Sequence, residues 1–428
     1  MRSITCENLL LDALTRIRTG QLLLTLPDGS TRFFGSSDTD GPSVSIAVKD
    51  REWFRRVVLG DDIGLGESFI EGLWETDDLS GFLKLLLLNR HHLGNPAAGF
   101  VLPVFKKIAQ EADWIRHLLN RNTRKGSVRN IHAHYDLGNQ FYQQFLDPGM
   151  TYSSAWFSSP HDALEDAQTE KYDRLCRRLD LRPGLNVLEI GSGWGGFAIH
   201  AATRYGCNVT SLTVSQEQYA YAKERVAAAG LADQITILFK DYRDMTGRFD
   251  RIASIEMLEA VGHEHLNSYF RQCARLLTPD GIVGLQVILT PDSRDHGYRR
   301  RSDYIRKHIF PGGHVPTFKS IHEAVARHSN WDLQHMESFG THYAETLRRW
   351  RARFLETTAQ RRALGFPETF DRKWLFYFAF CEAGFECRHI QVAQLIYAAP
   401  DNAEHSYGDR SLSLESDIPV RNPMKTTG

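Results

Sequence analysis

The sequence predicts an α/β fold with a mainly parallel sheet, from the order of its apolar runs and from a glycine-rich loop. From about residue 185 onward, short runs of β type alternate with longer runs of helical type. Strand, helix and strand in that order favour parallel pairing with right-handed crossovers, as in a doubly wound sheet. The expected strands are residues 185–191, 208–214, 235–239, 251–257 and 281–289, and the expected helices are 197–205, 215–230 and 265–277.

Length and charge limit the class of protein. The chain has 428 residues, and single cores stop growing at roughly 250 to 300, so we expect two domains. A net charge of −1 and 42% hydrophobic residues favour a soluble globular protein over a disordered or nucleic-acid-binding one. No apolar run reaches the roughly 20 residues of a membrane-spanning helix. Residues 1–17 have the pattern of an amphipathic helix rather than of a signal peptide, so we expect a cytoplasmic protein.

The six cysteines are scattered singly, without a Cys-x-x-Cys pair or a neighbouring histidine cluster. Such spacing is typical of reduced core thiols rather than of a zinc site or a disulfide framework. The sequence therefore predicts no metal centre.

The composition changes along the chain. Residues 1–96 read as a smaller N-terminal α+β domain, and residues 97–133 as a connector. The basic end of the connector, "RNTRKGSVRN", is either a solvated face or a contact with a membrane surface. The main domain is expected at 134–399, where residues 389–400 should return as an edge strand. A polar, flexible tail is expected at 400–428.

The loop after the first expected strand, "EIGSGWGG", is rich in glycine. Gly191, Gly193 and Gly196 have a spacing that lets the backbone approach a ligand closely at a helix N-terminus. Doubly wound sheets bind ligands at the carboxyl ends of their strands, where this loop lies. The spacing alone does not identify the ligand.

Acidic residues near this loop separate two classes of cofactor. A dinucleotide site normally places a carboxylate at the end of the second strand, where this chain has Thr213 and Ser215. Instead, Glu189 precedes the glycines, and the third strand runs into Asp241 and Tyr242. Burying an unpaired carboxylate is costly, so Glu189 is expected to serve a ligand rather than the core. This distribution fits S-adenosylmethionine better than NAD.

Six ordered motifs link the chain to a known family. They are "HYDLGNQFYQQFLDPGMTYSSAWF", "VLEIGSGWGGFAIHAA", "TVSQEQ", "DYRDMTGRFDRIASIEMLEAVG", "YIRKHIFPGGHVPT" and "HYAETLRRWRARF". With "GLGESFIEGLWE" in the N-terminal part, they resemble the cyclopropane-fatty-acid synthase family. The resemblance covers the chain except about the first 45 and last 30 residues. It implies a class I methyltransferase fold, which is Rossmann-like, and an N-terminal domain that engages lipid.

The resemblance also implies a reaction and its partners. Enzymes of this family transfer a methylene group from S-adenosylmethionine across the double bond of an unsaturated acyl chain, usually within a membrane phospholipid. The expected partners are therefore an unsaturated phospholipid or fatty acyl chain and the inner face of a membrane, bound peripherally. A homodimer is common in the family.

The same resemblance assigns residues to parts of the cofactor. Those expected beside its methionine moiety are Tyr152, Ser153 and Gly191. Those expected at its ribose and adenine are Thr213, Gln218, Asp241 and Tyr242. The aromatic run 134–157 then forms a wall and lid of the cofactor pocket, while Phe141 and Phe145 are expected to be core anchors.

The family's reaction needs a base, understood to be a bound bicarbonate held by cysteine, glutamate, histidine, isoleucine and tyrosine. Three of these positions match here as Glu259, Ile288 and Tyr343. The other two differ, because Ser154 stands in place of the cysteine and Gln286 in place of the histidine. Serine and glutamine can donate hydrogen bonds to an anion, but neither carries a proton or a positive charge at neutral pH.

Two interpretations of Ser154 and Gln286 stay open. In the first, both are tolerated, and the protein closes cyclopropane rings with Glu259 orienting bicarbonate or acting as the base. In the second, the product is a methyl-branched or methylene-bearing acyl chain, or the pocket serves a different nucleophile.

Two other classes of function also remain. One is a small-molecule amine N-methyltransferase, which resembles the synthases but generally keeps histidine where this chain has Ala260. The other is an inactive protein that binds lipid or cofactor, against which the intact glycine loop counts.

Two further sets of residues are candidates for a lipid site. Phe376, Phe378 and Phe380, in the helical run 372–385, are candidates to line an acyl tunnel. A basic stretch either faces phosphate groups or is a solvated surface. Its members are Arg299, Arg300, Arg301, Arg306 and Lys307.

Overall fold

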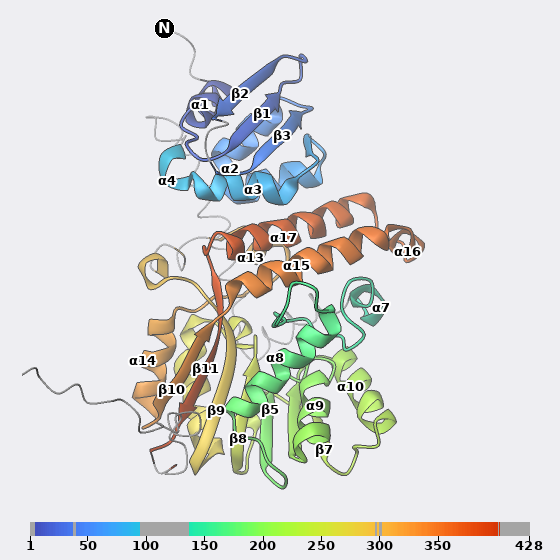
Figure 1. Ribbon diagram of the computed structural model, residues 1–428, viewed down its shortest axis with the longest axis vertical. Coiled ribbons are helices and arrows are strands. Elements are labelled where there is room, and N and C mark those ends of the chain that lie inside the picture. The colour runs from blue at the N-terminus through green and yellow to red at the C-terminus, as the bar shows by residue number, and fades with distance from the viewer. Residues whose placement is uncertain are drawn as a thin grey trace, which may run out of the picture.

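The computed structural model of the protein describes residues 5–36, 40–94, 137–295, 298, 302–400 and 402. An N-terminal sheet with its helices, a pair of long helices and a larger helix-flanked sheet follow one another along the long axis (Figure 1). The expected connector lies outside the described residues, as does the expected tail apart from Pro400 and Asn402. None of the described helices is long and apolar enough to cross a membrane.

A seven-stranded sheet forms the centre of the larger unit, in the order β10-β11-β9-β8-β5-β6-β7. From β7 to β9 neighbouring strands pair in parallel, whereas β9, β11 and β10 pair antiparallel. The sheet is mainly parallel, which confirms the predicted fold class. Its strands are β5 (Asn186–Ile190), β6 (Asn208–Thr213), β7 (Ile235–Phe239), β8 (Phe249–Ile255), β9 (Leu277–Leu289), β10 (Asp332–Ser338) and β11 (Gln391–Ala398).

Helices cover both faces of this sheet. Val187 of β5 belongs to a hydrophobic cluster with α8, α9 and α10, whereas Leu188 belongs to a cluster with α11 and α14. Successive strand residues face opposite helix layers, as the alternation of a strand requires. The helices are α7 (Asn139–Tyr142), α8 (Leu164–Arg178), α9 (Gly196–Tyr205), α10 (Gln216–Ala228), α11 (Leu266–Leu276), α13 (Tyr304–His308) and α14 (Phe318–His328). Single 3₁₀ turns are Tyr242–Asp244, Leu258–Ala260, His263–His265 and Asp292–Arg294.

The edge position expected for the last strand is wrong. β11 lies between β10 and β9, and all of its residues except the first are buried. The edge is formed by β10, whose residues are all half-buried or exposed. Its sequence, "DLQHMES", lacks the β-branched and aromatic residues that favour strands, so it gave no strand signal. The mostly apolar sequence of β11, interrupted by Gln394, is instead typical of an interior strand.

The N-terminal unit is a four-stranded sheet in the order β2-β1-β3-β4. Its strands are β1 (Gln21–Thr25), β2 (Thr31–Gly35), β3 (Ser43–Val48) and β4 (Trp74–Thr76). Its helices are α1 (Cys6–Leu14), α2 (Glu52–Ile70), α3 (Leu79–Leu88) and α4 (Arg90–Leu93). The long helix α2 is kinked at Asp61, whose φ is 49°.

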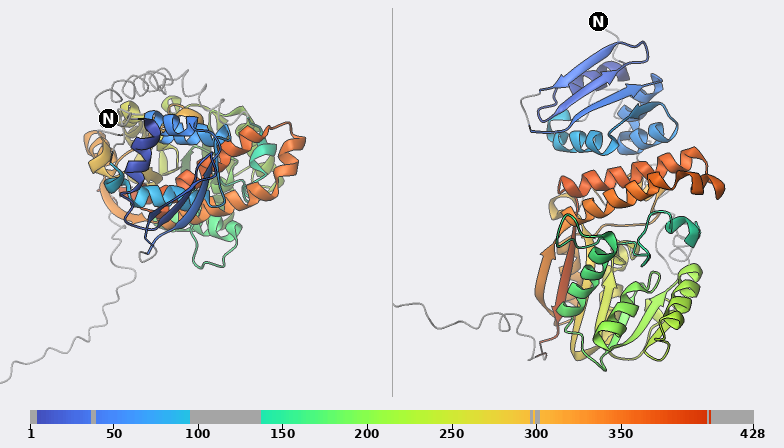
Figure 2. Two further views of the ribbon diagram at one scale, coloured as in Figure 1. Left: turned by 90° about the horizontal axis from the view of Figure 1, so that it is seen from above. Right: turned by 45° about the vertical axis from the view of Figure 1, so that its right-hand side comes forward.

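Helices from the C-terminal part of the chain lie between the two sheets (Figures 1 and 2). They are α15 (Gly340–Glu356), α16 (Thr358–Ala363) and α17 (Glu368–Glu386). The ring of Phe376 in α17 lies 6.0 Å from that of Phe69 in α2 and 4.5 Å from that of Tyr304, between centroids. The buried Glu382 of α17 accepts a hydrogen bond of 2.9 Å from Ser80 Oγ of α3. One hydrophobic cluster therefore runs from the N-terminal unit into the larger one.

Gly66 of α2 marks the tightest part of this contact. A Cβ at Gly66 would lie 2.4 Å from the ring of Tyr304 and 2.9 Å from that of Phe376. We expect Gly66→Ala to overpack the contact, lowering stability by about 1–3 kcal/mol and with it the thermal midpoint. Gly60→Ala in the same helix is the matched control, because no atom of the described residues lies within 4 Å of a Cβ there. Equal midpoints for the two variants would contradict the packing.

Candidate active site

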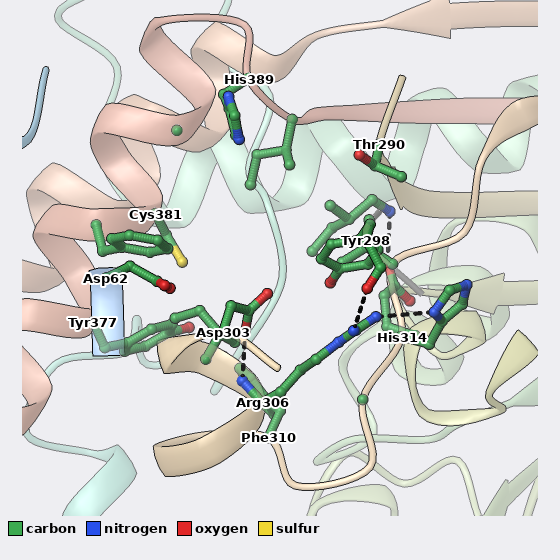
Figure 3. Close-up of a pocket in the computed structure, with 18 of the residues that line it drawn as sticks. Asp62, Thr290, Tyr298, Asp303, Arg306, Phe310, His314, Tyr377, Cys381 and His389 are labelled. Carbon is green, nitrogen blue, oxygen red and sulfur yellow. Dashed lines mark hydrogen bonds between the residues drawn. The ribbon is translucent and has the colours of Figure 1, made fainter. Parts of the chain in front are cut away.

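The larger of two adjoining cavities lies between the two units and has a volume of about 790 Å³. Its walls come from α2 at its kink, from the segment 302–315 and from α17. Figure 3 shows Asp62 of α2 opposite Asp303, with Tyr377 and Cys381 of α17 beside them. Much of the lining is apolar or aromatic, and includes Leu59, Ile63, Leu87, Ile305, Phe310 and Phe380.

The smaller cavity, of about 160 Å³, lies at the carboxyl ends of the parallel strands. All ten residues that the sequence proposed for the cofactor line it. They are Tyr152, Ser153, Glu189, Gly191, Gly193, Gly196, Thr213, Gln218, Asp241 and Tyr242. Phe141 and Phe145 lie in the hydrophobic core instead, as expected.

The loop that starts at Gly191 fits tightly against its surroundings. The φ of Gly191 is 98°, and a Cβ there would lie 2.7 Å from Cγ of Met257. Only glycine adopts this backbone readily, so the residue type is required by geometry at this position. On the opposite wall, Thr213 Oγ1 donates a hydrogen bond of 3.0 Å to Gln218 Oε1, which orients the glutamine side chain.

Glu189 is buried in the wall of the smaller cavity. Burial raises the pKa of its carboxyl to about 8, although the hydrogen bond from Ser211 and the nearby charge of Lys171 oppose the rise. The carboxyl is therefore protonated at neutral pH in the free protein, and a cation beside it would favour the charged form.

Lys171 of α8 is a buried cation that the sequence reasoning missed. Its Nζ donates a hydrogen bond of 2.6 Å to Ser153 Oγ. Burial lowers its pKa to about 8, opposed by the nearby carboxyl groups of Glu256, Asp147 and Glu189. Its position in the sequence could have revealed its burial. Lys171 follows Ala167 by four residues, so both lie on the buried face of the helix.

Among the described residues, three line both cavities, namely Tyr152, Glu256 and Ala260. The hydroxyl of Tyr152 donates a hydrogen bond of 3.0 Å to the hydroxyl of Tyr377 in α17. The two cavities therefore meet at a point with a carboxylate, a phenol and a methyl side chain on its walls.

Glu256 follows β8 directly and is the second residue that the sequence reasoning missed. Its Oε1 accepts hydrogen bonds from Ser154 N at 2.8 Å and from Gln286 Nε2 at 2.9 Å. Its Oε2 accepts one of 2.7 Å from the hydroxyl of Tyr343. Its φ is 51°, a left-handed backbone that costs a residue other than glycine about 1–2 kcal/mol. The sequence did contain a signal for this residue, because Glu256, like Glu189, is an acidic residue at the end of a buried strand.

Glu259 lines the larger cavity beside this group. Its Oε1 accepts a hydrogen bond of 2.5 Å from Ile288 N. Its buried Oε2 has no hydrogen-bond partner among the described residues. Burial, together with the negative charge of Glu256, raises the pKa of Glu259 to about 8, so this carboxyl holds its proton at neutral pH.

Ser154 and Gln286, which replace the family's cysteine and histidine, make different contacts in the site. The hydroxyl of Ser154 donates to Ala155 O at 3.0 Å rather than into the site, where only its backbone N–H points. Gln286 receives a hydrogen bond of 3.1 Å on its Oε1 from Gln394 Nε2, so its NH₂ group faces Glu256. The donors expected to hold bicarbonate are thus bonded to protein carboxylates, and the residues present do not fit a bound bicarbonate ion.

Two expectations about the lipid site need correction. Arg306 is buried and donates to Tyr298 O at 2.8 Å, and Lys307 pairs with Glu67 at 2.9 Å. Neither side chain is freely solvated, but Arg306 also lines the larger cavity. Residues 299–301 lie outside the described part. Phe380 lines the larger cavity, but Phe376 and Phe378 are fully buried in the core because the helix turns them away.

Comparisons with known proteins place the chain in a family. The model of the mycolic acid cyclopropane synthetase family matches residues 122–395. The tuberculostearic acid methyltransferase UfaA1 of Mycobacterium tuberculosis is 37% identical over 380 residues, which cover 87% of this chain and 86% of that one. The cyclopropane-fatty-acyl-phospholipid synthase of Escherichia coli K12 is 36% identical over 353 residues, with coverages of 82% and 87%.

Solved structures agree with this assignment. The cyclopropane synthase MmaA2 of Mycobacterium tuberculosis has a TM-score of 0.60 and 31% identity, and covers 63% of this chain and 98% of its own. The mycolic acid cyclopropane synthase CmaA1, solved with SAH and CTAB, has a TM-score of 0.59, 30% identity and the same coverages. The resemblance read from the motifs is confirmed, and the chain belongs to the mycolic acid cyclopropane synthetase family of S-adenosylmethionine-dependent methyltransferases.

Proposed function

We propose that this protein methylates a carbon–carbon double bond in an unsaturated fatty acyl chain, with the cofactor in the smaller cavity and the chain in the larger one. The observation that carries the proposal is the meeting of the two cavities at Tyr152, Glu256 and Ala260. A methyl donor and an apolar acceptor can approach each other only at such a junction, and holding them in line is a large part of this catalysis.

The residues of the smaller cavity fit S-adenosylmethionine. When bound, this cofactor supplies an electrophilic methyl group on a sulfonium cation. The buried carboxyl of Glu189 can compensate a positive charge, and the backbone at Gly191 leaves room for a close approach. Because all four line this cavity, we assign Thr213 and Gln218 to the hydroxyl groups of the ribose, and Asp241 and Tyr242 to the flanks of the adenine.

The larger cavity fits a hydrocarbon chain. Its lining combines residues of both units, and the N-terminal unit contributes Leu59, Ile63 and Leu87. We therefore assign the N-terminal unit to lipid binding, and propose a phospholipid acyl chain reached from the cytoplasmic face of a membrane. The relative from Escherichia coli, which is named for such a substrate, supports this choice.

Aromatic faces near the junction suit the expected intermediate. Methyl transfer to an alkene leaves a carbocation on the neighbouring chain carbon, and aromatic rings stabilise cations. The ring of Phe310 lies 6.3 Å from that of Tyr152 and 6.0 Å from that of Tyr377, between centroids. These rings would flank a cation formed at the junction.

The balance of atoms limits the product. Transfer of CH₃⁺ followed by loss of one proton adds CH₂, so the product is a cyclopropane or a methylene-bearing chain. A saturated methyl branch needs a hydride in addition, which a separate reductant would have to supply. We therefore propose a CH₂-enriched acyl chain as the product of this protein.

A small-molecule amine is a less suitable substrate. The coclaurine N-methyltransferase shares the fold, with a TM-score of 0.58, but at 18% identity it says nothing about substrate. An amine acceptor has no use for a largely apolar cavity of about 790 Å³ that extends into the N-terminal unit.

Isotope labelling tests the reaction. We expect a bacterial host without a related enzyme, fed deuterated-methyl methionine and expressing this protein, to make fatty acids enriched by CH₂. Retention of two deuterium atoms is expected, because the proton is lost from the transferred methyl group. Fatty acids of unchanged mass would contradict the proposed function, and retention of three deuterium atoms would contradict loss of the proton from the methyl group.

Binding of the cofactor should release a proton near Glu189. At pH 7 its carboxyl is protonated in the free protein, and a bound cation favours the charged form. We expect calorimetry in two buffers of different ionisation enthalpy to detect the release of up to about one proton for each cofactor bound. Glu189→Gln should abolish that release and weaken binding. Equal proton release by both proteins would exclude Glu189 as its source.

A further inference from the structure

We infer that Glu256 is the general base of the reaction, and that its carboxylate takes the place that a bound bicarbonate ion has in the related synthases. The inference rests on the proposed function and adds to it the group that removes the proton. It accounts for the glutamine at position 286, whose amide donates a hydrogen bond to the carboxylate of Glu256.

The hydrogen-bond donors of the site converge on Glu256. Backbone N–H of Ser154, the amide of Gln286 and the hydroxyl of Tyr343 all donate to its carboxylate, at 2.7 to 2.9 Å. These are three of the five positions that the resemblance gives to the bicarbonate ligands. A fourth, the N–H of Ile288, donates to Glu259. A side-chain carboxylate thus has the contacts that a separate anion would need.

The backbone is shaped to place this side chain. The left-handed φ of Glu256 turns the chain at the end of β8, where the residue's own N–H donates to Gln286 O at 2.6 Å. Strained backbone of this kind persists only where its surroundings hold it, and it is concentrated at functional sites. As a result, Glu256 is the one acidic residue that lines both cavities in the part of the chain that the structure describes.

The negative charge of the carboxyl pair belongs on Glu256. Two neighbouring carboxyls in a buried site do not both ionise readily. Burial raises the pKa of Glu256, but its three hydrogen bonds and the nearby cation of Lys171 oppose the rise. Glu259 accepts one hydrogen bond, and burial together with the negative charge of Glu256 raises its pKa to about 8. Glu259 is the member that holds the proton, which leaves Glu256 charged and able to accept another.

The step is a single proton transfer. After the methyl carbon has bonded to the chain, a carboxylate oxygen of Glu256 takes one of its protons. The electron pair of that C–H bond then forms the second bond of a cyclopropane ring, or a methylene double bond if a hydride has first shifted along the chain. Glu256 becomes a neutral acid and later returns its proton to solvent.

Bicarbonate dependence tests the inference on the unaltered protein. We expect the purified enzyme, with S-adenosylmethionine and unsaturated phospholipid vesicles, to turn over equally fast in CO₂-free buffer and with added sodium bicarbonate. A wild-type enzyme that requires bicarbonate would overturn the inference but leave the proposed function standing. Absence of any CH₂-enriched product in both buffers would overturn both.

Variants at Glu256 give the matching test. Glu256→Gln should lower the rate by about 10²–10⁴-fold, as loss of a general base does, with cooperative thermal unfolding as evidence that the variant is folded. Glu256→Gly vacates the space of the carboxylate and suits the left-handed backbone, so sodium bicarbonate should restore activity to it and not to Glu256→Gln. Glu264→Gln, an exposed neighbour, is the control for the substitution itself. Glu256→Gln with the wild-type rate would overturn the inference.

Discussion

The active site depends on keeping one buried carboxylate, that of Glu256, charged at the junction of two cavities. Removing such a group from water is costly unless hydrogen bonds replace its hydration. Here the donors come from the segment before α8, from β9 and from α15. These elements are far apart in sequence, so the carboxylate is stabilised only when the sheet, the segment before α8 and the C-terminal helices are assembled together.

The need to keep the carboxylate of Glu256 charged also accounts for the neutral or polar groups around it. Gln394 fixes the amide of Gln286 through a hydrogen bond, so that its NH₂ group faces the carboxylate. Glu259 adds no second negative charge, because its pKa is raised to about 8. A histidine at position 286 would introduce a second titrating group, whereas glutamine supplies a donor at any pH.

The helices between the two sheets connect this chemistry to the acyl cavity. α15 carries Tyr343 toward Glu256, while α17 contributes Tyr377 and Phe380 to the larger cavity and packs on the N-terminal unit. A change in how the N-terminal unit packs, as at Gly66, therefore acts on the wall of the cavity as well as on stability.

Local patterns in the sequence predicted the sheet and the cofactor side of the site well. Glu189, Gly191 and Asp241 each follow or end a parallel strand, so their meeting at one edge of the sheet follows from topology alone. Glu256 was missed because its role arises from contacts with residues 30, 87 and 102 positions away in the sequence, which no local period encodes. Phe376 and Phe378 were misassigned because apolar residues on one helix serve core and cavity alike until packing separates them. The order of β10 and β11 depended in the same way on pairing between distant segments.

The most direct measurement is a crystal structure of the protein grown with bicarbonate and the demethylated cofactor. We expect the Glu256 carboxylate within hydrogen-bond distance of Ser154 N, Gln286 Nε2 and the Tyr343 hydroxyl, with no separate anion among these donors. A bicarbonate ion bound by the three donors, with Glu256 turned away, would contradict the account.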